Sequence, residues 1–328
     1  MAKVTFLSIL QWSEGECREY LERQRWPDGP ICPKCGAPEP YIINRKSATK
    51  NIVRKLYRCK ACKRQYTATV GTIFEDSKIP LNKWFAAIYL MCSSKKGVSA
   101  HQIHRSLDIT YKSAWFMCHR IREAMRDKDG LLLSGTVESD ETYIGPRRRR
   151  GHPLMHERIR DEIDMGLREA PKKGRYWQEG KAIVFGIVER GGRVVTAHVK
   201  EATSNELRPI LLNNIDVKKS RLITDAHPAY RLIRNHLPHD VIRHESEYVR
   251  GDVHTQNIEG YWSLLKRGLY GTFHHVDEGY LGNYLNEFSF RFNRRKISDA
   301  ERFASAMGQT RGRLTWYCQT PQPENPFA

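Results

Sequence analysis

The chain lacks the features that mark a membrane or secreted protein. None of its apolar runs approaches the roughly 20 residues that a membrane-spanning helix requires. Residues 1–10 lack the basic, apolar and small-residue succession of a signal peptide, and internal repeats and low-complexity segments are missing as well. With 40% hydrophobic residues among 328, the chain has enough apolar material for about two folded domains, which excludes wholesale disorder. We therefore expect a folded, soluble, intracellular protein.

Acidic residues are scarce relative to basic ones. The 37 Asp and Glu residues are outnumbered by 55 Lys and Arg residues, which leaves a net charge of +18. Residues 1–130 hold 24 basic and 12 acidic residues, a net +12, so residues 131–328 contribute only +6. An excess of this size is typical of proteins that bind polyanions, most often nucleic acid. A solvated basic surface or a ribosome-like affinity is the alternative interpretation.

Four of the eight cysteines form two closely spaced pairs: Cys32, Cys35, Cys59 and Cys62. Each pair can present two thiolates to one ion from a tight turn, and two pairs complete the tetrahedral sulfur site of a zinc ribbon. Short strands are predicted between the pairs, and such a closed site stabilises a fold rather than catalysing a reaction. Disulfides or a redox motif are the alternatives, which the missing signal peptide disfavours. Cys92 and Cys118 lie on apolar helix faces and are expected in a core.

Apolar residues recur at three- and four-residue spacing from residue 81 to 126, which predicts three helices. Ser99 is the expected cap of the second helix, and residues 108–110 form the turn before the third. The third helix carries basic residues that we expect to contact DNA: Lys112, Arg120, Arg122 and Arg126. Two helices joined by a tight turn, the second of them basic, suggest a DNA-reading helix-turn-helix. An ordinary three-helix bundle would have the same periodicity.

From residue 131 onwards β-type patterns replace the helical ones. The expected strands cover residues 136–145, 181–189, 193–200, 221–225 and 241–243. The expected helices cover residues 205–213, 256–267 and 278–293. Between the first two strands lies a polar, basic stretch in which Arg147 and Arg148 begin a run of four arginines. This run is either a solvated face or a clamp for phosphates.

Acidic residues stand on two of these strands and on the helix after the last one. In an RNase H-like sheet the first and fourth strands are adjacent, which would bring Asp140 beside Asp225, and Glu259 on the helix could point at the same place. Three carboxylates at one point repel one another unless a divalent cation lies between them. Mg²⁺ prefers such oxygen ligands, and two ions about 4 Å apart can support displacement at a phosphodiester. Taken singly, each acid could equally be a helix cap or a surface residue.

The motifs around these acids resemble those of bacterial insertion-sequence transposases of the ISXO type. The matching segments are residues 140–145, 224–230, 254–267, 271–275 and 287–295, with the zinc ribbon ahead of them. The resemblance covers roughly residues 25–296. It implies an RNase H-like DDE fold, divalent-metal chemistry and recognition of terminal inverted repeats on DNA.

Asp140 and Asp225 match the first two catalytic acids of that family. The third position is open between Glu259 and Asn257, because members of the family carry either an acid or an asparagine there. We favour Glu259, since Lys266 follows seven residues later on the same helix face and could hold a nearby phosphate. Histidines 254, 274 and 275 lie around this motif, either as contacts to metal or phosphate or as structural groups.

We therefore expect an α/β fold with an RNase H-like mixed sheet and flanking helices over residues 131–310. A zinc ribbon with an N-terminal helix is expected at 1–77, a helix-turn-helix-like domain at 78–130 and a tail at 311–328.

The expected function is that of a DDE-type DNA transposase with structural Zn²⁺ and catalytic Mg²⁺ or Mn²⁺. Its partners are the double-stranded DNA of the element ends and of the target, contacted also through Lys266 and Arg267. A homodimer or larger assembly is expected in the prokaryotic cytoplasm, at the nucleoid. The alternatives are an RNase H-like nuclease without strand transfer and a domesticated DNA-binding regulator.

Overall fold

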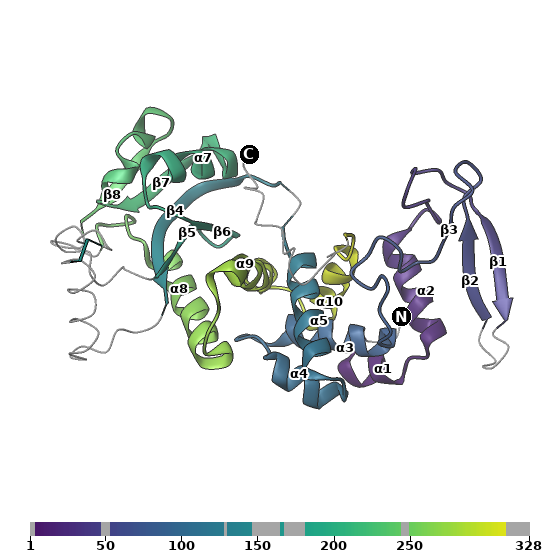
Figure 1. Cartoon of the computed structure of the whole chain (residues 1–328). Coiled ribbons are helices and arrows are strands. Elements are labelled where there is room, and N and C mark those ends of the chain that lie inside the picture. The colour runs from purple at the N-terminus through teal and green to yellow at the C-terminus, as the bar shows by residue number, and fades with distance from the viewer. Residues whose placement is uncertain are drawn as a thin grey trace. The chain divides into compact units, whose positions relative to one another are not determined.

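The computed structural model describes residues 4–46, 53–127, 130–145, 165–166, 181–243 and 249–312. The chain divides into two compact units, whose elements are labelled in Figure 1. The first unit comprises Met1–Gly130, Gly271–Phe273 and Gly279–Ala328, and the second comprises Leu131–Tyr270 and His274–Glu278. Within the described residues, every helix is too short or too polar to cross a membrane.

The first unit begins with two helices and a small sheet. The helices are α1 (Phe6–Gln11) and α2 (Glu14–Arg25), and the strands are β1 (Tyr41–Lys46), β2 (Val53–Arg58) and β3 (Gln65–Tyr66). The three strands pair antiparallel in the order β1-β2-β3. Trp26, at the end of α2, packs edge-on against Tyr57 and Tyr66 with ring centroids 5.5 and 6.0 Å apart. These aromatic contacts attach the sheet to α2.

Three helices follow, as the periodicity predicts. They are α3 (Leu81–Ser93), α4 (Ala100–Leu107) and α5 (Tyr111–Ala124). The Ser99 hydroxyl accepts a hydrogen bond from the N–H of Gln102 at 3.2 Å and so begins α4. Asp108 ends α4 in the left-handed region, with φ of 47°, and Thr110 caps α5. The α4–turn–α5 segment is therefore the helix-turn-helix-like element that the sequence predicts.

Two further helices of the C-terminal part pack in the first unit. They are α9 (Glu278–Asn293) and α10 (Asp299–Gly308). Phe303 of α10 stacks on Tyr20 with ring centroids 5.7 Å apart and meets Phe85 of α3 edge-on at 6.1 Å. The sequence suggests one domain from 131 to 310, whereas the apolar faces of α9 and α10 find their partners on helices of the first unit.

The second unit is built on a five-stranded mixed sheet. Its strands are β4 (Leu133–Ile144), β5 (Ala182–Glu189), β6 (Val194–Val199), β7 (Ile215–Asp225) and β8 (His239–Ile242). Their order is β6-β5-β4-β7-β8, in which β4 pairs antiparallel with β5 and parallel with β7. The expected RNase H-like adjacency of the first and fourth strands is thus confirmed.

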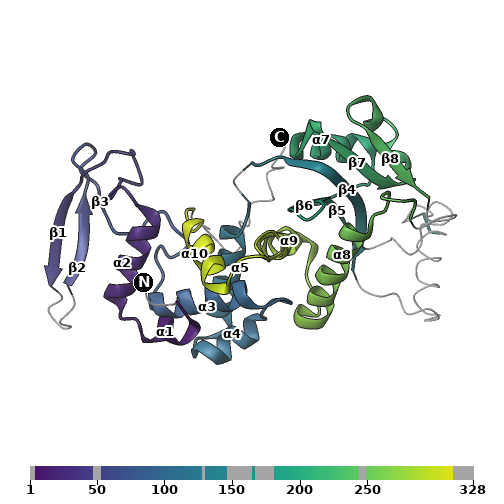
Figure 2. The ribbon, with the colours of Figure 1, turned by 180° about the vertical axis from the view of Figure 1, so that it is seen from behind.

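Helices cover both faces of this sheet. Figures 1 and 2 show α7 (Ser204–Asn214) and α8 (Gln256–Gly268) on opposite sides of β4. Short helical turns complete the unit: η1 (Pro228–Tyr230), η2 (Ile233–Asn235) and the start of η3 (Leu269–Phe273). Because side chains alternate along a strand, successive side chains at the end of β4 point in turn to the face that carries α8 and to the face that carries η1.

Candidate functional site

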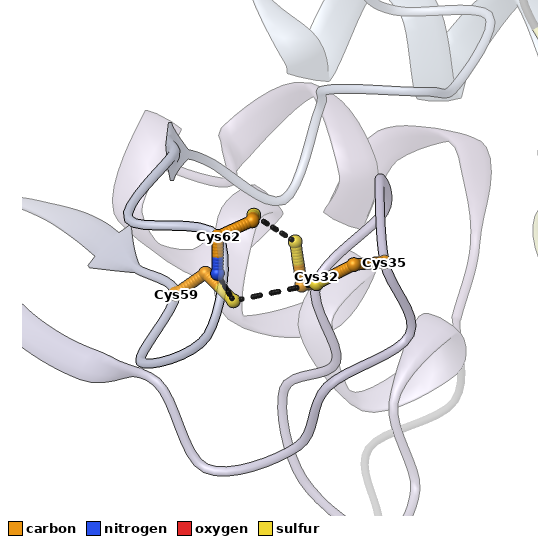
Figure 3. Close-up of side chains that lie close together, drawn as sticks. All are labelled: Cys32, Cys35, Cys59 and Cys62. Atoms are coloured by element: carbon orange, nitrogen blue, oxygen red, sulfur yellow. Dashed lines mark hydrogen bonds between the residues drawn. The ribbon is translucent and has the colours of Figure 1, made fainter.

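The four paired cysteines converge in one cluster (Figure 3). Their sulfur atoms all lie within 4.8 Å of one another, with 3.7 Å between Cys32 and Cys62 and 3.5 Å between Cys35 and Cys59. Tetrahedral zinc with Zn–S bonds of about 2.3 Å needs sulfurs roughly 3.8 Å apart, so the cluster fits this ion. The N–H of Cys62 points at the sulfur of Cys59 from 3.4 Å and lowers the pKa of Cys59 to about 6, which favours the metal-binding thiolate. The predicted zinc ribbon is confirmed.

The cysteines outside the cluster are core residues where the structure describes them. Cys17, Cys92 and Cys118 are fully buried. Burial raises the pKa of Cys92 to about 12 and that of Cys118 to about 11, so both remain protonated and inert at neutral pH.

The second centre lies where β4 and β7 run side by side. The parallel pairing of β4 with β7 runs as far as Glu138 and Ile223, and Asp140 and Asp225 each follow two residues further along their strands. Paired residues on neighbouring strands point to the same face of a sheet, and the strands are about 4.8 Å apart. Burial and the charge of Asp225 raise the pKa of Asp140 to about 6. The register therefore brings the two expected aspartates together.

Glu259 joins this centre from the first turn of α8. Its charge contributes to the raised pKa of Asp140, and its carboxylate accepts a hydrogen bond of 2.8 Å from the hydroxyl of Thr255. Among the described residues, the cysteines are the one group of three or more metal-ligating side chains whose ligand atoms all lie within 4.8 Å. The carboxylates of Asp140, Asp225 and Glu259 are thus electrostatically coupled, but their oxygens lie further apart than the four cysteine sulfurs do.

One face of α8 is directed at Asp140. Glu259, Trp262 and Lys266 follow one another at spacings of three and four residues, so they form one stripe. The indole Nε1 of Trp262 donates a hydrogen bond of 2.9 Å to Oδ2 of Asp140. Burial lowers the pKa of Lys266, while the nearby charge of Asp140 opposes that shift. The stripe therefore brings an acid, a hydrogen-bond donor and a cation to the carboxylate centre.

Gly186 makes this approach possible. It lies opposite Asp140 on β5, and a Cβ atom there would lie 2.5 Å from the ring of Trp262. Any larger residue would push the indole away from the sheet and from the Asp140 carboxylate.

Glu138, two residues before Asp140 on the same face of β4, holds the start of α8. Its fully buried carboxylate accepts hydrogen bonds from the backbone N–H groups of Asn257 and Ile258, at 2.8 and 3.1 Å. Arg190 donates to the same carboxylate from 2.7 Å. A carboxylate at a helix N-terminus satisfies free N–H groups and interacts favourably with the helix dipole. Glu138 thereby fixes α8, and with it Glu259, relative to Asp140.

Asn257 belongs to this cap. Its amide Nδ2 donates a hydrogen bond of 2.8 Å to Oε1 of Glu138. The two candidates for the third acidic position therefore occupy different surroundings, Asn257 beside Glu138 and Glu259 in the stripe with Trp262 and Lys266.

A further buried acid, Glu141, points to the opposite face of β4. The hydroxyl of Tyr230 donates to its Oε2, and Nδ1 of His227 lies 3.2 Å from its Oε1. Burial raises the pKa of Glu141 to about 8 despite the Tyr230 hydrogen bond, and the charges of Asp225 and Asp140 add to the shift. The backbone N–H of His227 in turn donates a hydrogen bond of 3.0 Å to Oδ1 of Asp225. Glu141 therefore anchors the turn that follows Asp225.

Two of the arginines expected to contact DNA are inside the first unit. Arg122 is 2% exposed and pairs with the buried Glu287 at 2.6 Å, while Arg120 donates to the carbonyls of Ile73 and Glu75 at 2.7 and 3.0 Å. The assignment of Arg120 and Arg122 as DNA contacts is corrected here, because their guanidinium groups are used to hold the fold together. Helical spacing alone does not reveal that Glu287 of α9 pairs with Arg122 or that the carbonyls of Ile73 and Glu75 bind Arg120.

The other residues predicted to contact DNA have different surroundings. Lys112 is exposed in the first turn of α5, and Arg126 is half-buried with Glu123 3.9 Å away. On α8, Arg267 is exposed and Lys266 is half-buried. Arg147 and Arg148 lie outside the described residues.

The three histidines of the predicted site lie in different surroundings. Nδ1 of His254 lies 3.4 Å from Oε1 of Glu138, and the backbone carbonyl of His254 accepts a hydrogen bond of 3.0 Å from Arg190. His254 therefore belongs to the cap of α8. His274 and His275 are exposed, and His275 pairs with Asp277 at 2.9 Å.

Sequence reasoning missed Glu138, Glu141 and Trp262 as parts of this site. The signals were present in part, since Glu138 and Asp140 share one face of a strand and Trp262 stands three residues after Glu259. Their partners on α8 and η1 come from distant segments, which strand and helix periodicity does not specify.

The same segments match known transposase domains. Residues 132–293 match the ISXO2-like transposase domain, a DDE domain, and residues 12–65 match the transposase zinc-ribbon domain. The "Uncharacterized protein in transposable element ISH50" of Halobacterium salinarum is 31% identical over 287 residues, which are 85% of this chain and 90% of that protein. The chain belongs to the ISXO2-like transposase family. In this ISXO2-like transposase, the stretch matched as the DDE domain contains β4, β7 and α8 and so the whole carboxylate centre.

Proposed function

We propose that the protein is a DNA transposase that binds the terminal inverted repeats of an insertion sequence and catalyses metal-dependent strand cleavage and strand transfer into target DNA. The observation that carries this proposal is the meeting of Asp140 on β4 with Asp225 on β7, opposite the stripe of α8 that contains Glu259. The chain's net charge of +18 would attract a polyanionic strand to this acidic centre.

The carboxylates suit divalent cations. Asp140, Asp225 and Glu259 offer the hard oxygen ligands that Mg²⁺ and Mn²⁺ prefer. Burial raises the pKa of Asp140, and the charges of Asp225 and Glu259 add to that shift; a bound cation would relieve this repulsion. When bound at such a site, divalent ions stabilise charge on the attacking and leaving oxygens of a phosphodiester displacement.

The neighbouring side chains position these groups and the substrate. Lys266 presents its ammonium beside Asp140, where it would hold a phosphate oxygen of the strand. Trp262 orients the Asp140 carboxylate through its indole N–H, and Glu138 fixes the start of α8. Glu259 is the third acid in this assignment, because the amide of Asn257 is engaged by Glu138.

The first unit would hold the DNA of the element ends. Lys112 in the first turn of α5 and Arg126 at its end are the basic residues of the predicted set that carry this role. On α8, Arg267 would contact the DNA backbone. Because two ends must be joined to one target, the active form would be a homodimer or larger assembly, working where the DNA is, at the nucleoid in the prokaryotic cytoplasm.

A strand-transfer assay tests the proposal. The full chain is incubated with labelled duplexes carrying the inverted-repeat ends, a plasmid target, and Mg²⁺ or Mn²⁺. Joined products support a transposase, cut ends alone indicate an RNase H-like nuclease, and a mobility shift without chemistry indicates a DNA-binding regulator. The variants Asp140→Asn and Asp225→Asn serve as controls that should bind DNA without cutting it.

A further inference from the structure

One face of the zinc-ribbon sheet carries an aromatic ring between cations. In the strand register, Tyr41 of β1 lies opposite Arg58 of β2, and Arg58 lies opposite Gln65 of β3. These three side chains form a row on one face of the sheet, and Ile43 and Leu56 form the next row. We call these five residues the outer face.

The opposite face is the packed one. Tyr57 and Tyr66 are 3% and 1% exposed and pack against Trp26 at the end of α2. Since side chains alternate along a strand, the outer face points away from α2. Tyr41 is 57% exposed, and Arg58 and Gln65 are exposed too. A sheet face that exposes a large aromatic ring beside half-buried Ile43 and Leu56 is a candidate binding surface.

Two cations, Lys60 and Arg58, are placed near Tyr41. The Nζ atom of Lys60 lies 5.7 Å from the ring centroid, and its ion pair with Glu39 is long, at 3.4 Å, and solvent-exposed. The Arg58 guanidinium makes no hydrogen bond or ion pair with another described residue. Arg64, next to Gln65 in the chain, is exposed as well. Arg58, Lys60 and Arg64 are thus all solvent-exposed cations.

Charge decides which partner this face accepts. Residues 40–74 contain nine Lys and Arg residues and no Asp or Glu. A second copy of the chain that met this face with its own would set one cationic segment against another, which like-charge repulsion disfavours. A polyanion with a repeating phosphate backbone has the complementary charge, and the Tyr41 ring offers a flat apolar surface to its sugars and bases.

We propose that the outer face, together with Lys60 beside the Tyr41 ring, is a binding surface for the backbone of double-stranded DNA, in which Arg58 and Lys60 contact phosphates and Tyr41 contacts the sugar–base edge. The proposal rests on the proposed function, since it names the part of the chain that holds the element's DNA. It adds a DNA contact outside the helix-turn-helix and outside the carboxylate centre.

Binding measurements without divalent ions test this surface separately from the chemistry. The affinity of the full chain for a duplex carrying the element end is measured over a series of salt concentrations, for wild type and for Arg58→Ala/Lys60→Ala. Each lost phosphate contact removes about 0.9 from the slope of log affinity against log salt, so the double variant should lose about 1.8. Lys218→Ala/Lys219→Ala removes two exposed charges from β7 and should keep the wild-type slope.

Substitution of Tyr41 provides an independent test of the outer face. Because its ring carries no charge, Tyr41→Ala should weaken binding at fixed salt through the lost contact and leave the slope unchanged, whereas Tyr41→Phe should bind like wild type. Bound zinc is measured in each variant, so that loss of the ribbon fold is recognised.

An unchanged slope in the zinc-loaded Arg58/Lys60 variant, or a slope change equal to that of the β7 control, overturns the proposal. So does an effect of these substitutions on sedimentation rather than on DNA binding, which would make the face a contact between copies. Failure of strand transfer alone would count against the proposed function and leave this surface standing.

Discussion

Oε2 of Glu138 accepts hydrogen bonds from the backbone N–H groups of Asn257 and Ile258, so an acid of strand β4 caps helix α8 across 119 and 120 residues of chain. Asp140 follows Glu138 on the same face of the strand, and Glu259 follows the cap on the helix. One carboxylate therefore fixes the relative position of two others. The role of Glu138 is structural, and its effect on activity would be exerted through that position.

Replacing this cap tests the link. Glu138→Gln turns an amide N–H₂ toward groups that are themselves donors, and it leaves Arg190 without its charged partner. Breaking such a buried network costs about 3 kcal/mol. Cleavage should fall about 10- to 100-fold at temperatures where the variant is folded, with a higher Mn²⁺ concentration needed for half-maximal rate. Glu201→Gln, at an exposed position in the same unit, should leave stability and rate unchanged. Equal rates and melting temperatures in the two variants would rule out the positioning role.

Zinc should hold the ribbon together. Removal of zinc by a chelator, or Cys59→Ser, should release the packing of Trp26, Tyr57 and Tyr66 and abolish their near-ultraviolet circular dichroism. The α/β unit should keep its far-ultraviolet signal. Cys318→Ser, outside both cysteine pairs, is the matched control and should retain one zinc per chain. Retention of the aromatic signal in zinc-free protein would contradict a structural role for the ion.

A buried ion cluster should stabilise the first unit. Glu287 is fully buried between Arg122 and Arg291. Burial opposes its ionisation, but the two arginines hold the pKa of Glu287 below its usual value. Glu287→Gln leaves two buried guanidinium groups without a counter-charge, which costs about 3–5 kcal/mol and lowers the melting temperature by roughly 10 °C.

The same variant separates a structural from a DNA-binding role of Arg122. At temperatures where Glu287→Gln is folded, the salt slope of DNA binding should equal that of wild type. Glu123→Gln on α5, whose pair with Arg126 is long at 3.9 Å, should change the melting temperature little. Tighter DNA binding with a steeper salt slope in the folded Glu287 variant would return Arg122 to the DNA surface, because the substitution frees its guanidinium.

His119 should make the first unit sensitive to mild acid. Burial, with the charge of Arg122, lowers the pKa of His119 to about 3 from its usual 6.5. Below pH 6.5 the unfolded chain takes up a proton that the folded chain refuses, so stability falls as the pH decreases, by up to about 1.4 kcal/mol per pH unit. Melting temperatures between pH 7 and 5 should therefore decline less steeply in His119→Gln than in wild type. The exposed His101→Gln should follow wild type, and identical slopes in all three proteins would exclude this contribution.

Much of the second unit could be predicted because its pattern is local. A nearly continuous apolar run marks β5, β-type patterns mark β4 and β7, and the 3.6-residue period marks α8, so the adjacency of the Asp140 and Asp225 strands follows once the sheet type is assigned. The cysteine spacing predicts the zinc cluster for the same reason. In each case the sequence pattern that predicts the strand, the helix or the cysteine pair spans only a short stretch of the chain.

What could not be predicted depends on partners from remote segments. The spacing of Arg122 on α5 is that of a solvent-facing cation, yet Glu287, 165 residues later, buries and pairs it. Helices α9 and α10 join the first unit through contacts such as Phe303 on Tyr20, which no local pattern specifies. Glu138 resembles any acid on an exposed strand edge until α8 is placed over it.

The most direct test of the account is the anomalous X-ray scattering of Mn²⁺ in crystals of the full chain bound to the DNA of an element end. We expect metal density coordinated by carboxylate oxygens of Asp140, Asp225 and Glu259, with the amide of Asn257 still on Glu138. Metal held by Asn257 while Glu259 points to solvent would contradict the assignment of the third acid. Absence of metal between Asp140 and Asp225 in the DNA-bound protein would contradict the catalytic site itself.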